Sequence, residues 1–208
     1  SPQAAANALS QSNSSFLFAP LYHAGIKHAM PVRTALKSRT IFNLLGPLIN
    51  PAKPDYQLLG VYDPALTAVM AEALQQLGVK AAWVVHGSGC DEVALHGTTY
   101  VCELKDGELT EFSLTPDDFG VALTPLSALA GGEPAENAAA TLAILQGEGQ
   151  SAHKAAVAIN VAAMLKIAGM GDDLKLNTRA VLELLSSNKA FNTLSHFKQV
   201  SQQETNHG

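Results

Sequence analysis

The segment YQLLGVYDPALTAVMAEALQQLGVKAAWVVHG spans residues 56–87 and decides the fold class. Its two ends, YQLLGVY and AAWVVHG, are short apolar runs rich in Val, Leu and aromatic residues, which is typical of β-strands. Between them, apolar residues recur at helical spacing after Asp63 and Pro64 and before Gly78, which predicts a capped amphipathic helix over 64–77. Because near-continuous apolar strands around a helix indicate a buried parallel sheet, we expect an α/β fold with a mostly parallel sheet flanked by helices.

The chain on either side of this unit supports the same class. Strand-like runs at 99–104 and 108–114 flank Lys105-Asp106-Gly107, and an Asp-Gly pair in that position predicts a hairpin. Helices are predicted at the start of the chain, capped by Ser1, and over 136–146, 152–167 and 178–187, with Gly147 and Gly169 as stops. We therefore divide the chain into a helical segment at 1–50, an α/β domain at 51–200 and a frayed polar tail at 201–208.

Composition excludes several classes of protein. With 208 residues, 47% of them hydrophobic, the chain can bury a sizeable core. The net charge is -5 and no cluster of Lys and Arg stands out, which argues against a nucleic-acid partner. No apolar run approaches the roughly 20 residues that span a bilayer, and the first residues lack the pattern of a signal peptide. We expect a cytoplasmic protein with neither nucleic acid nor membrane as partner.

The two cysteines, Cys90 and Cys102, have no paired ligand spacing such as CxxC around them. Free cysteine most often behaves as a small apolar residue. Both are therefore interpreted as ordinary thiols.

A glycine-bearing loop follows AAWVVHG and ends in two adjacent carboxylates, Asp91 and Glu92. Ligands of open α/β sheets bind beyond the carboxyl ends of the strands, and carboxylates suit Mg2+, whose shell is completed by waters and substrate phosphates. Equally, two acids after a glycine turn can simply solvate a loop, and the loop matches neither GxGxxG nor GxxxxGK[ST]. His86 has no partner visible in the sequence, which favours a structural role over catalysis.

Two further stretches could line a small-molecule site. FLFAPLYHAGIKHAMPVR, residues 16–33, offers apolar walls for an aromatic ring and, in Arg33, a fork for a carboxylate. Its alternative is a surface helix with solvated basic residues. In RTIFNLLGPLINP, residues 39–51, a short helix is predicted to end at Gly46-Pro47, before an Asn-Pro turn. A small ligand could approach the backbone at Gly46, or the segment could be only a tight connection.

Five segments occur along the chain in this order: FLFAPLYHAGIKHAMPVR, RTIFNLLGPLINPA, VVHGSGCDEV, LTPDDFG and GGEPAEN. In sequence, order and approximate spacing, they closely resemble those of the anthranilate phosphoribosyltransferase family. The resemblance extends to about Gly169. It implies a fold like those of nucleoside phosphorylases and phosphoribosyltransferases, and a homodimer in the intact enzyme.

The resemblance also implies an activity and the residues that serve it. The activity is the Mg2+-dependent transfer of the 5-phosphoribosyl group from phosphoribosyl pyrophosphate to the amine of anthranilate, in tryptophan biosynthesis. Arg33 resembles the contact to the anthranilate carboxylate, and the positions that line the anthranilate pocket are Ala19, Pro20, His23, Ile26 and Gly46. Asp91 and Glu92 resemble the carboxylate pair that holds Mg2+. No residue is implied as a catalyst beyond positioning and metal binding.

The chain departs from the family in one respect. Neither a GTGGD loop, which wraps the pyrophosphate in the family, nor a KHGNR segment occurs in the 208 residues. We therefore expect a chain truncated at its N-terminus and inactive alone. The alternatives are a nucleic-acid-binding, non-catalytic homologue and a pyrimidine phosphorylase. The acidic charge and the retained Asp91 and Glu92 argue against the first, and the FAPLYH and NLLGPLINP segments argue against the second.

Overall fold

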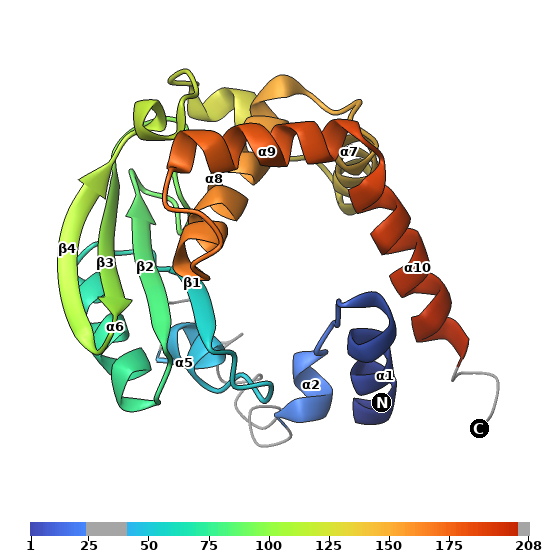
Figure 1. The fold of residues 1–208 in the computed structure, drawn as a ribbon, viewed down its shortest axis with the longest axis horizontal. Coiled ribbons are helices and arrows are strands. Elements are labelled where there is room, and N and C mark those ends of the chain that lie inside the picture. The colour runs from blue at the N-terminus through green and yellow to red at the C-terminus, as the bar shows by residue number, and fades with distance from the viewer. Residues whose placement is uncertain (24–40, 204–208) are drawn as a thin grey trace. The chain divides into compact units, whose positions relative to one another are not determined.

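The computed structural model of the chain describes residues 1–23 and 41–203 (Figure 1). Two compact units divide it: one is formed by Ser1–Asn43 and Asn188–Gly208, and the other by Leu44–Ser187. The larger unit holds the sheet. The smaller unit is built from the two terminal parts of the chain, and its described elements are helices.

A four-stranded sheet forms the centre of the larger unit (Figure 1). Its strands are β1 (Tyr56–Gly60), β2 (Ala81–Gly87), β3 (Thr99–Lys105) and β4 (Glu108–Leu114), in the spatial order β1-β2-β3-β4. β1 and β2 are parallel and are connected through α6 (Leu66–Gln76), as the strand-helix-strand pattern predicts. The α/β class with flanking helices is confirmed.

The described sheet is mixed rather than mostly parallel, because β2 with β3 and β3 with β4 pair antiparallel. A parallel neighbour requires a crossover connection of a dozen or more residues, and among the described strands only the link through α6 supplies one. The hairpin between β3 and β4 turns at Asp106 and Gly107, whose φ angles of 52° and 80° are those of a tight turn of the mirror-image type. The hairpin predicted from the Asp-Gly pair is thus confirmed, and it makes β3 and β4 antiparallel.

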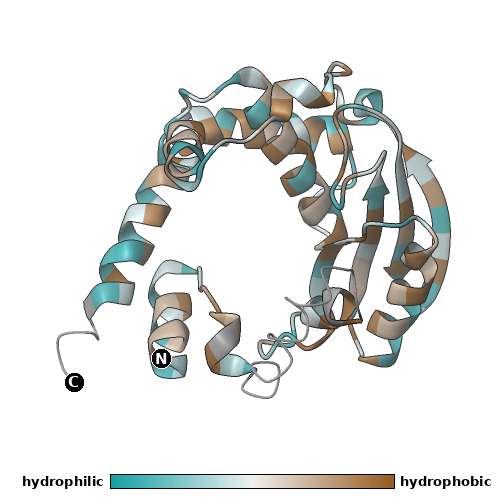
Figure 2. Cartoon of the chain, turned by 180° about the vertical axis from the view of Figure 1, so that it is seen from behind, coloured by the Kyte–Doolittle hydropathy of each residue, from teal (hydrophilic) through white to brown (hydrophobic). Residues whose placement is uncertain are grey.

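Both faces of β2 are buried, and successive side chains go to opposite sides. Ala82 and Val84 join a cluster with Leu74 of α6, while Trp83 and Val85 join a second cluster with Ile159 of α8 (Ser151–Ile167). The hydropathy colouring of Figure 2 shows apolar residues along the strands and along the helices beside them. A strand that needs apolar residues on both faces reads as a continuous apolar run, which explains AAWVVHG.

The remaining helices of the larger unit are α5 (Phe42–Leu48), η1 (Pro116–Phe119), η2 (Leu126–Leu129), α7 (Pro134–Leu145) and α9 (Leu174–Ser186). α7 and α8 begin and end close to their predicted bounds. α9 begins earlier than predicted, because the Asp173 carboxylate caps it by accepting from the amides of Lys175 and Leu176. Gly147 and Gly169 have φ angles of 82° and 69°, so each takes the left-handed conformation that follows a helix end. The predicted stops are confirmed.

The smaller unit contains α1 (Pro2–Ser12), α2 (Ala19–Tyr22) and α10 (Lys189–Gln203). The Ser1 hydroxyl accepts a hydrogen bond from the Ala4 amide at 3.1 Å, which confirms the predicted cap. α1 and α10 pack together, and His196 Nε2 lies 3.1 Å from the carbonyl oxygen of Gln11. α10 runs through Gln203 and buries Val200, so the predicted frayed tail from 201 begins inside a helix; residues 204–208 lie outside the described ranges.

Within the described ranges, every helix is too short or too polar to cross a bilayer.

The α6 face of the sheet should respond strongly to loss of a core side chain. Leu74 of α6 is fully buried, whereas Leu77, just after the helix, is 58% exposed. We expect Leu74→Ala to lower the free energy of unfolding by about 2–5 kcal/mol, because it removes buried methyl groups and leaves a cavity. The matched control Leu77→Ala should change it by less than about 0.5 kcal/mol. Urea denaturation measures both, and equal effects would contradict the described packing.

Candidate functional site

The loop after β2 is a tight turn that holds two carboxylates at the end of the strand. The Gly87 amide donates to the Cys90 carbonyl at 2.8 Å, and the Cys90 amide donates back to the Gly87 carbonyl at 3.0 Å. Between them Ser88 and Gly89 have φ angles of 50° and 95°, so the chain reverses within two residues. Asp91 follows directly, and its side chain and that of the next residue, Glu92, are exposed.

His86 joins this loop to the end of β1. The Gly89 amide donates to His86 Nε2 at 3.2 Å, so Nε2 carries no hydrogen and Nδ1 carries it. That Nδ1 lies 2.9 Å from the Val61 carbonyl oxygen, which accepts its hydrogen bond. Both ring nitrogens are therefore occupied, and His86 has the structural role that the sequence favours.

The backbone of Asp91 and Glu92 lies directly against the ends of β1 and β2. A Cβ atom added to Gly60 would lie 1.5 Å from the Asp91 carbonyl oxygen, and one added to Gly87 would lie 2.2 Å from that of Glu92. Only glycine permits such an approach. Both carboxylates thus lie at the carboxyl edge of the parallel pair, where ligands of open α/β sheets bind.

Asn160 of α8 holds the next residue of this segment from the other side. The Val93 amide donates to Asn160 Oδ1 at 3.0 Å, and Asn160 Nδ2 donates to the Val93 carbonyl at 3.2 Å. The same Nδ2 also donates to the Ala156 carbonyl at 2.9 Å. Sequence reasoning missed this residue, although a single Asn within the apolar run AAVAINVAAML was the available signal.

The electrostatics of the loop suit a cation. Burial raises the pKa of the Cys90 thiol above its ordinary value, and the negative charges of Glu92 and then Asp91 raise it further. Cys90 therefore stays a protonated thiol at neutral pH, in line with the ordinary thiol inferred from the sequence. In the described part of the chain, no group of three or more His, Cys, Asp or Glu side chains could enclose a metal ion. Asp91 and Glu92 suit the coordination that is usual for Mg2+, in which one or two carboxylates bind the ion and water and substrate phosphates supply the other ligands.

The residues predicted to line the anthranilate pocket are distributed over both units. Ala19 and Pro20 begin α2, and His23 follows this helix as a half-buried residue. Gly46 belongs to the larger unit; apart from its own turn of helix, no described residue has a heavy atom within 4 Å of where its Cβ would be. Ile26 and Arg33 lie outside the described residues.

The helix that contains Gly46 ends later than predicted. α5 does not end at Gly46-Pro47 but includes both and continues to Leu48, and the Ile49 amide donates to the Leu45 carbonyl at 3.1 Å. Proline is tolerated there because it loses only one hydrogen bond, in the last turn of a short helix. The predicted turn at Asn50 is present, with the Lys53 amide donating to the Asn50 carbonyl at 3.0 Å.

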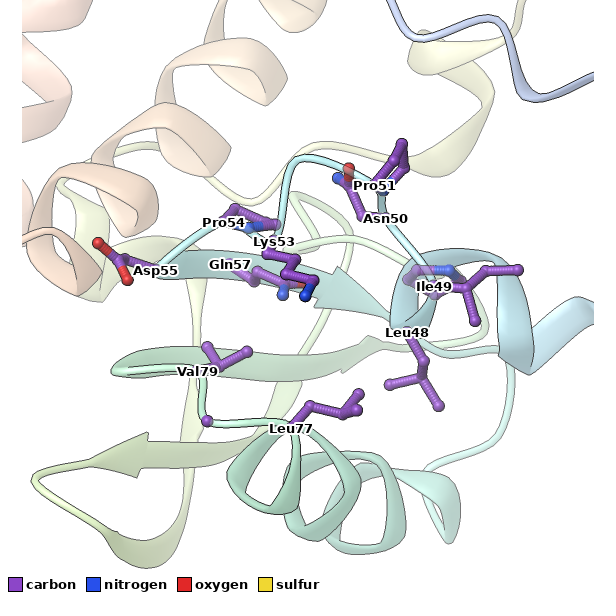
Figure 3. Close-up of a pocket in the computed structure, with 12 residues that line it drawn as sticks. Leu48, Ile49, Asn50, Pro51, Lys53, Pro54, Asp55, Gln57, Leu77 and Val79 are labelled. Carbon is purple, nitrogen blue, oxygen red and sulfur yellow. The ribbon is translucent and has the colours of Figure 1, made fainter. Parts of the chain in front are cut away.

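A cavity of about 490 Å³ lies at the opposite end of β1 from the carboxylates (Figure 3). Its lining comes from Pro47 to Asp55, the start of β1 and the turn after α6; Lys53 and Gln57 are among its polar residues. Its lining includes residues 47–51 of the segment singled out at 39–51, but none of the residues that the sequence analysis named individually as site residues. The candidate site at Asp91 and Glu92 therefore rests on the chemistry of the two carboxylates and on their place on the sheet, and not on the volume of a cavity.

Comparison with known proteins gives one family and a consistent set of relatives. Residues 1–191 match the glycosyl transferase family, a/b domain. The chain is 56% identical over 201 residues to the anthranilate phosphoribosyltransferase of Shewanella sp. strain MR-4, covering 97% of this chain and 58% of that protein. It is 54% identical over 207 residues to that of Aeromonas hydrophila, covering 100% and 60%. The chain thus spans less than two thirds of the length of these relatives.

Solved structures show the same similarity. The crystal structure of anthranilate phosphoribosyltransferase from Thermus thermophilus has a TM-score of 0.83 and 41% identity, over 90% of this chain and 56% of that one. The Saccharomyces cerevisiae enzyme in complex with PRPP and Mg has a TM-score of 0.79 and 28% identity, over 86% and 52%.

Asn160 should determine how firmly the segment after the carboxylates is held. We expect Asn160→Ala to lower the free energy of unfolding by about 2 kcal/mol, because the buried Val93 amide loses its acceptor. Asn160→Asp keeps an acceptor for that amide but places a carboxylate oxygen against the carbonyls of Val93 and Ala156, so it should also lower stability while protecting the Val93 amide better than Asn160→Ala does. Urea denaturation gives the stability, and amide hydrogen exchange at Val93 reports the local effect. Unchanged exchange at Val93 in Asn160→Ala would show that this side chain does not hold the segment.

Proposed function

Because this chain belongs to the glycosyl transferase family, we propose that it serves the transfer of a 5-phosphoribosyl group from phosphoribosyl pyrophosphate to the amine of anthranilate, in tryptophan biosynthesis. The observation that carries the proposal is the 56% identity to an anthranilate phosphoribosyltransferase over 97% of the chain. The position of Asp91 and Glu92 at the carboxyl edge of β1 and β2 supports it.

Asp91 and Glu92 are the residues that would hold Mg2+. Their oxygens are hard donors, both side chains are exposed, and the close contacts at Gly60 and Gly87 hold their backbone against the sheet. When bound there, Mg2+ supplies charge neutralisation for a pyrophosphate group. Its use is supported by the structure of the yeast enzyme in complex with PRPP and Mg.

The segments at 16–33 and 39–51 would bind anthranilate, the acceptor of the phosphoribosyl group. Arg33 would pair with the anthranilate carboxylate, and the pocket would be lined by Ala19, Pro20, His23, Ile26 and Gly46. The ribose carbon loses its bond to a pyrophosphate oxygen and forms a bond to the amine nitrogen, which then releases a proton to solvent. Since the amine is already nucleophilic, positioning supplies the acceleration and no side chain needs to act as a base.

Assembly as a homodimer and a location in the cytoplasm belong to the same proposal. The runner-up function is a non-catalytic homologue that binds nucleic acid. A net charge of -5 opposes it, because phosphate contacts require clustered Lys and Arg. The exposed carboxylates of Asp91 and Glu92 would also repel a phosphate backbone.

The first test follows the fluorescence of anthranilate in the presence of phosphoribosyl pyrophosphate and Mg2+. We expect the Shewanella relative to consume anthranilate and this chain alone to leave it unchanged, because its 208 residues contain no GTGGD string to wrap the pyrophosphate. Turnover by this chain at a comparable rate would mean that another segment binds the pyrophosphate. Failure of both proteins would show that the assay itself does not work.

The second test examines metal binding without turnover. Paramagnetic Mn2+ should broaden the amide resonances of Asp91, Glu92 and Val93, and Mg2+ should reverse the effect by competition. The double variant Asp91→Asn, Glu92→Gln should lose the broadening, because it removes both carboxylates. Asp117→Asn is the matched control, since Asp117 is an exposed acid in η1 and should not matter. Broadening that persists in the double variant would place the metal elsewhere.

A further inference from the structure

The two proposed metal carboxylates lie in the 88–98 loop, which connects β2 to β3. Downstream of them, residues 93–95 are buried. The Ala94 amide donates to the Thr99 hydroxyl oxygen at 2.9 Å, and Asn160 bonds both backbone groups of the preceding residue. The chain after the carboxylates is therefore fixed through its backbone.

Upstream of the carboxylates, Ser88 bonds to the far end of the same loop through both its hydroxyl and its carbonyl. The Ser88 hydroxyl donates to the Thr98 carbonyl at 2.9 Å. His96 Nε2 lies 3.1 Å from the Ser88 carbonyl oxygen, which can only accept, so the ring nitrogen donates. These two hydrogen bonds join the ends of the loop that carries Asp91 and Glu92.

The far end of the loop approaches Ser88 so closely that residue 97 has no room for a side chain. A Cβ atom added to Gly97 would lie 2.3 Å from Ser88 Oγ and 2.9 Å from Ser88 Cβ. Apart from its two chain neighbours, no other described residue has a heavy atom within 4 Å of that position. The Ser88 hydroxyl could turn away only by giving up its bond to Thr98, and its Cβ could move only with the backbone of the turn.

A movement of Ser88 is transmitted to Asp91 because the turn between them is rigid. Gly87 and Cys90 are bonded to each other in both directions, and Asp91 is the next residue. Ser88 itself has a φ angle of 50°. A residue with a side chain keeps this left-handed conformation where its surroundings hold it there.

We propose that Ser88 is a positioning residue for the metal site, whose contacts with Thr98 and Gly97 hold the Asp91 and Glu92 carboxylates in place before the metal binds. Ser88 touches neither metal nor substrate and acts through the backbone of the turn. Ligands that are already fixed lose less conformational entropy on binding, so the affinity for the ion rises. The inference rests on the proposed function, since it takes these two carboxylates as the metal ligands.

The test measures the dissociation constant for Mn2+ from the broadening of the amide resonances of residues 91–93. Ser88→Ala should weaken Mn2+ binding about fivefold, the usual worth of one hydrogen bond, and should leave the urea midpoint unchanged because the side chain is exposed. Gly97→Ala should weaken binding further, because its methyl group displaces the hydroxyl and pushes against the Ser88 Cβ. Ser186→Ala is the matched control, since that exposed hydroxyl also donates to a backbone carbonyl, at 3.1 Å, but lies in α9.

A double variant shows whether the effect of residue 97 passes through Ser88. Ser88→Gly removes the two atoms that the new methyl group would meet, so adding Gly97→Ala to it should weaken Mn2+ binding no further than Ser88→Gly alone does. Ser88→Gly also separates the contacts from the backbone conformation, because glycine adopts a positive φ without strain. It should bind Mn2+ at least as weakly as Ser88→Ala.

The outcomes distinguish this inference from the metal site itself. Equal affinity in the unaltered chain and in Ser88→Ala, full affinity in Ser88→Gly, additive losses in the double variant, or losses that only follow the urea midpoint would each overturn the positioning role and leave the metal site in place. No broadening at residues 91–93 in the unaltered chain would overturn both. Ser88→Ala decides the question even where Gly97→Ala fails to fold.

Discussion

The close approach of the Asp91–Glu92 backbone to the ends of β1 and β2 is the constraint on which the candidate site depends. It requires glycine at 60 and 87, since any side chain there would collide with a carbonyl oxygen of the loop. Side chains from both sides then hold the loop in this position, among them His86 from within the sheet and Asn160 from α8. The carboxylates themselves remain exposed because the contacts that secure the segment are made almost entirely by its backbone.

β2 links this constraint to the core. Its alternate side chains enter two separate apolar clusters, one beneath α6 and one beneath α8, so the strand is held from both faces. The helix that supplies Ile159 to the core also supplies Asn160 to the loop, one residue further along. Packing of α8 on the sheet therefore places a polar side chain against the segment that carries the carboxylates. Two adjacent side chains of α8 thus have different roles: Ile159 stabilises the core, and Asn160 fixes the position of the loop.

Short-range sequence patterns predicted the helices and the hairpin well, but they predicted the direction of strand pairing less well. The spacing in 64–77, the Asp-Gly pair and the glycines at 147 and 169 each depend on a few neighbouring residues. The structure has the hairpin and both glycine stops, and its helix α6 lies inside the predicted bounds but begins two residues later, at Leu66. The mostly parallel sheet was wrong in the described strands because apolar runs indicate burial on both faces and do not specify the direction of the neighbour. α10 extends past the predicted boundary because it packs on α1, at the other end of the sequence.

By itself, the sequence determined the α/β class, most of the helix ends, the hairpin turn and the choice of Asp91 and Glu92 as candidate metal ligands. Each of these follows from residue type and short-range spacing. Only the tertiary structure decided that Asn160 bonds a residue 67 positions away, that Gly60 touches Asp91, and that His86 bonds both the Val61 carbonyl and the loop after β2. The physical reason is that steric fit and hydrogen-bond geometry between distant segments arise when the chain is packed, and no local periodicity encodes them.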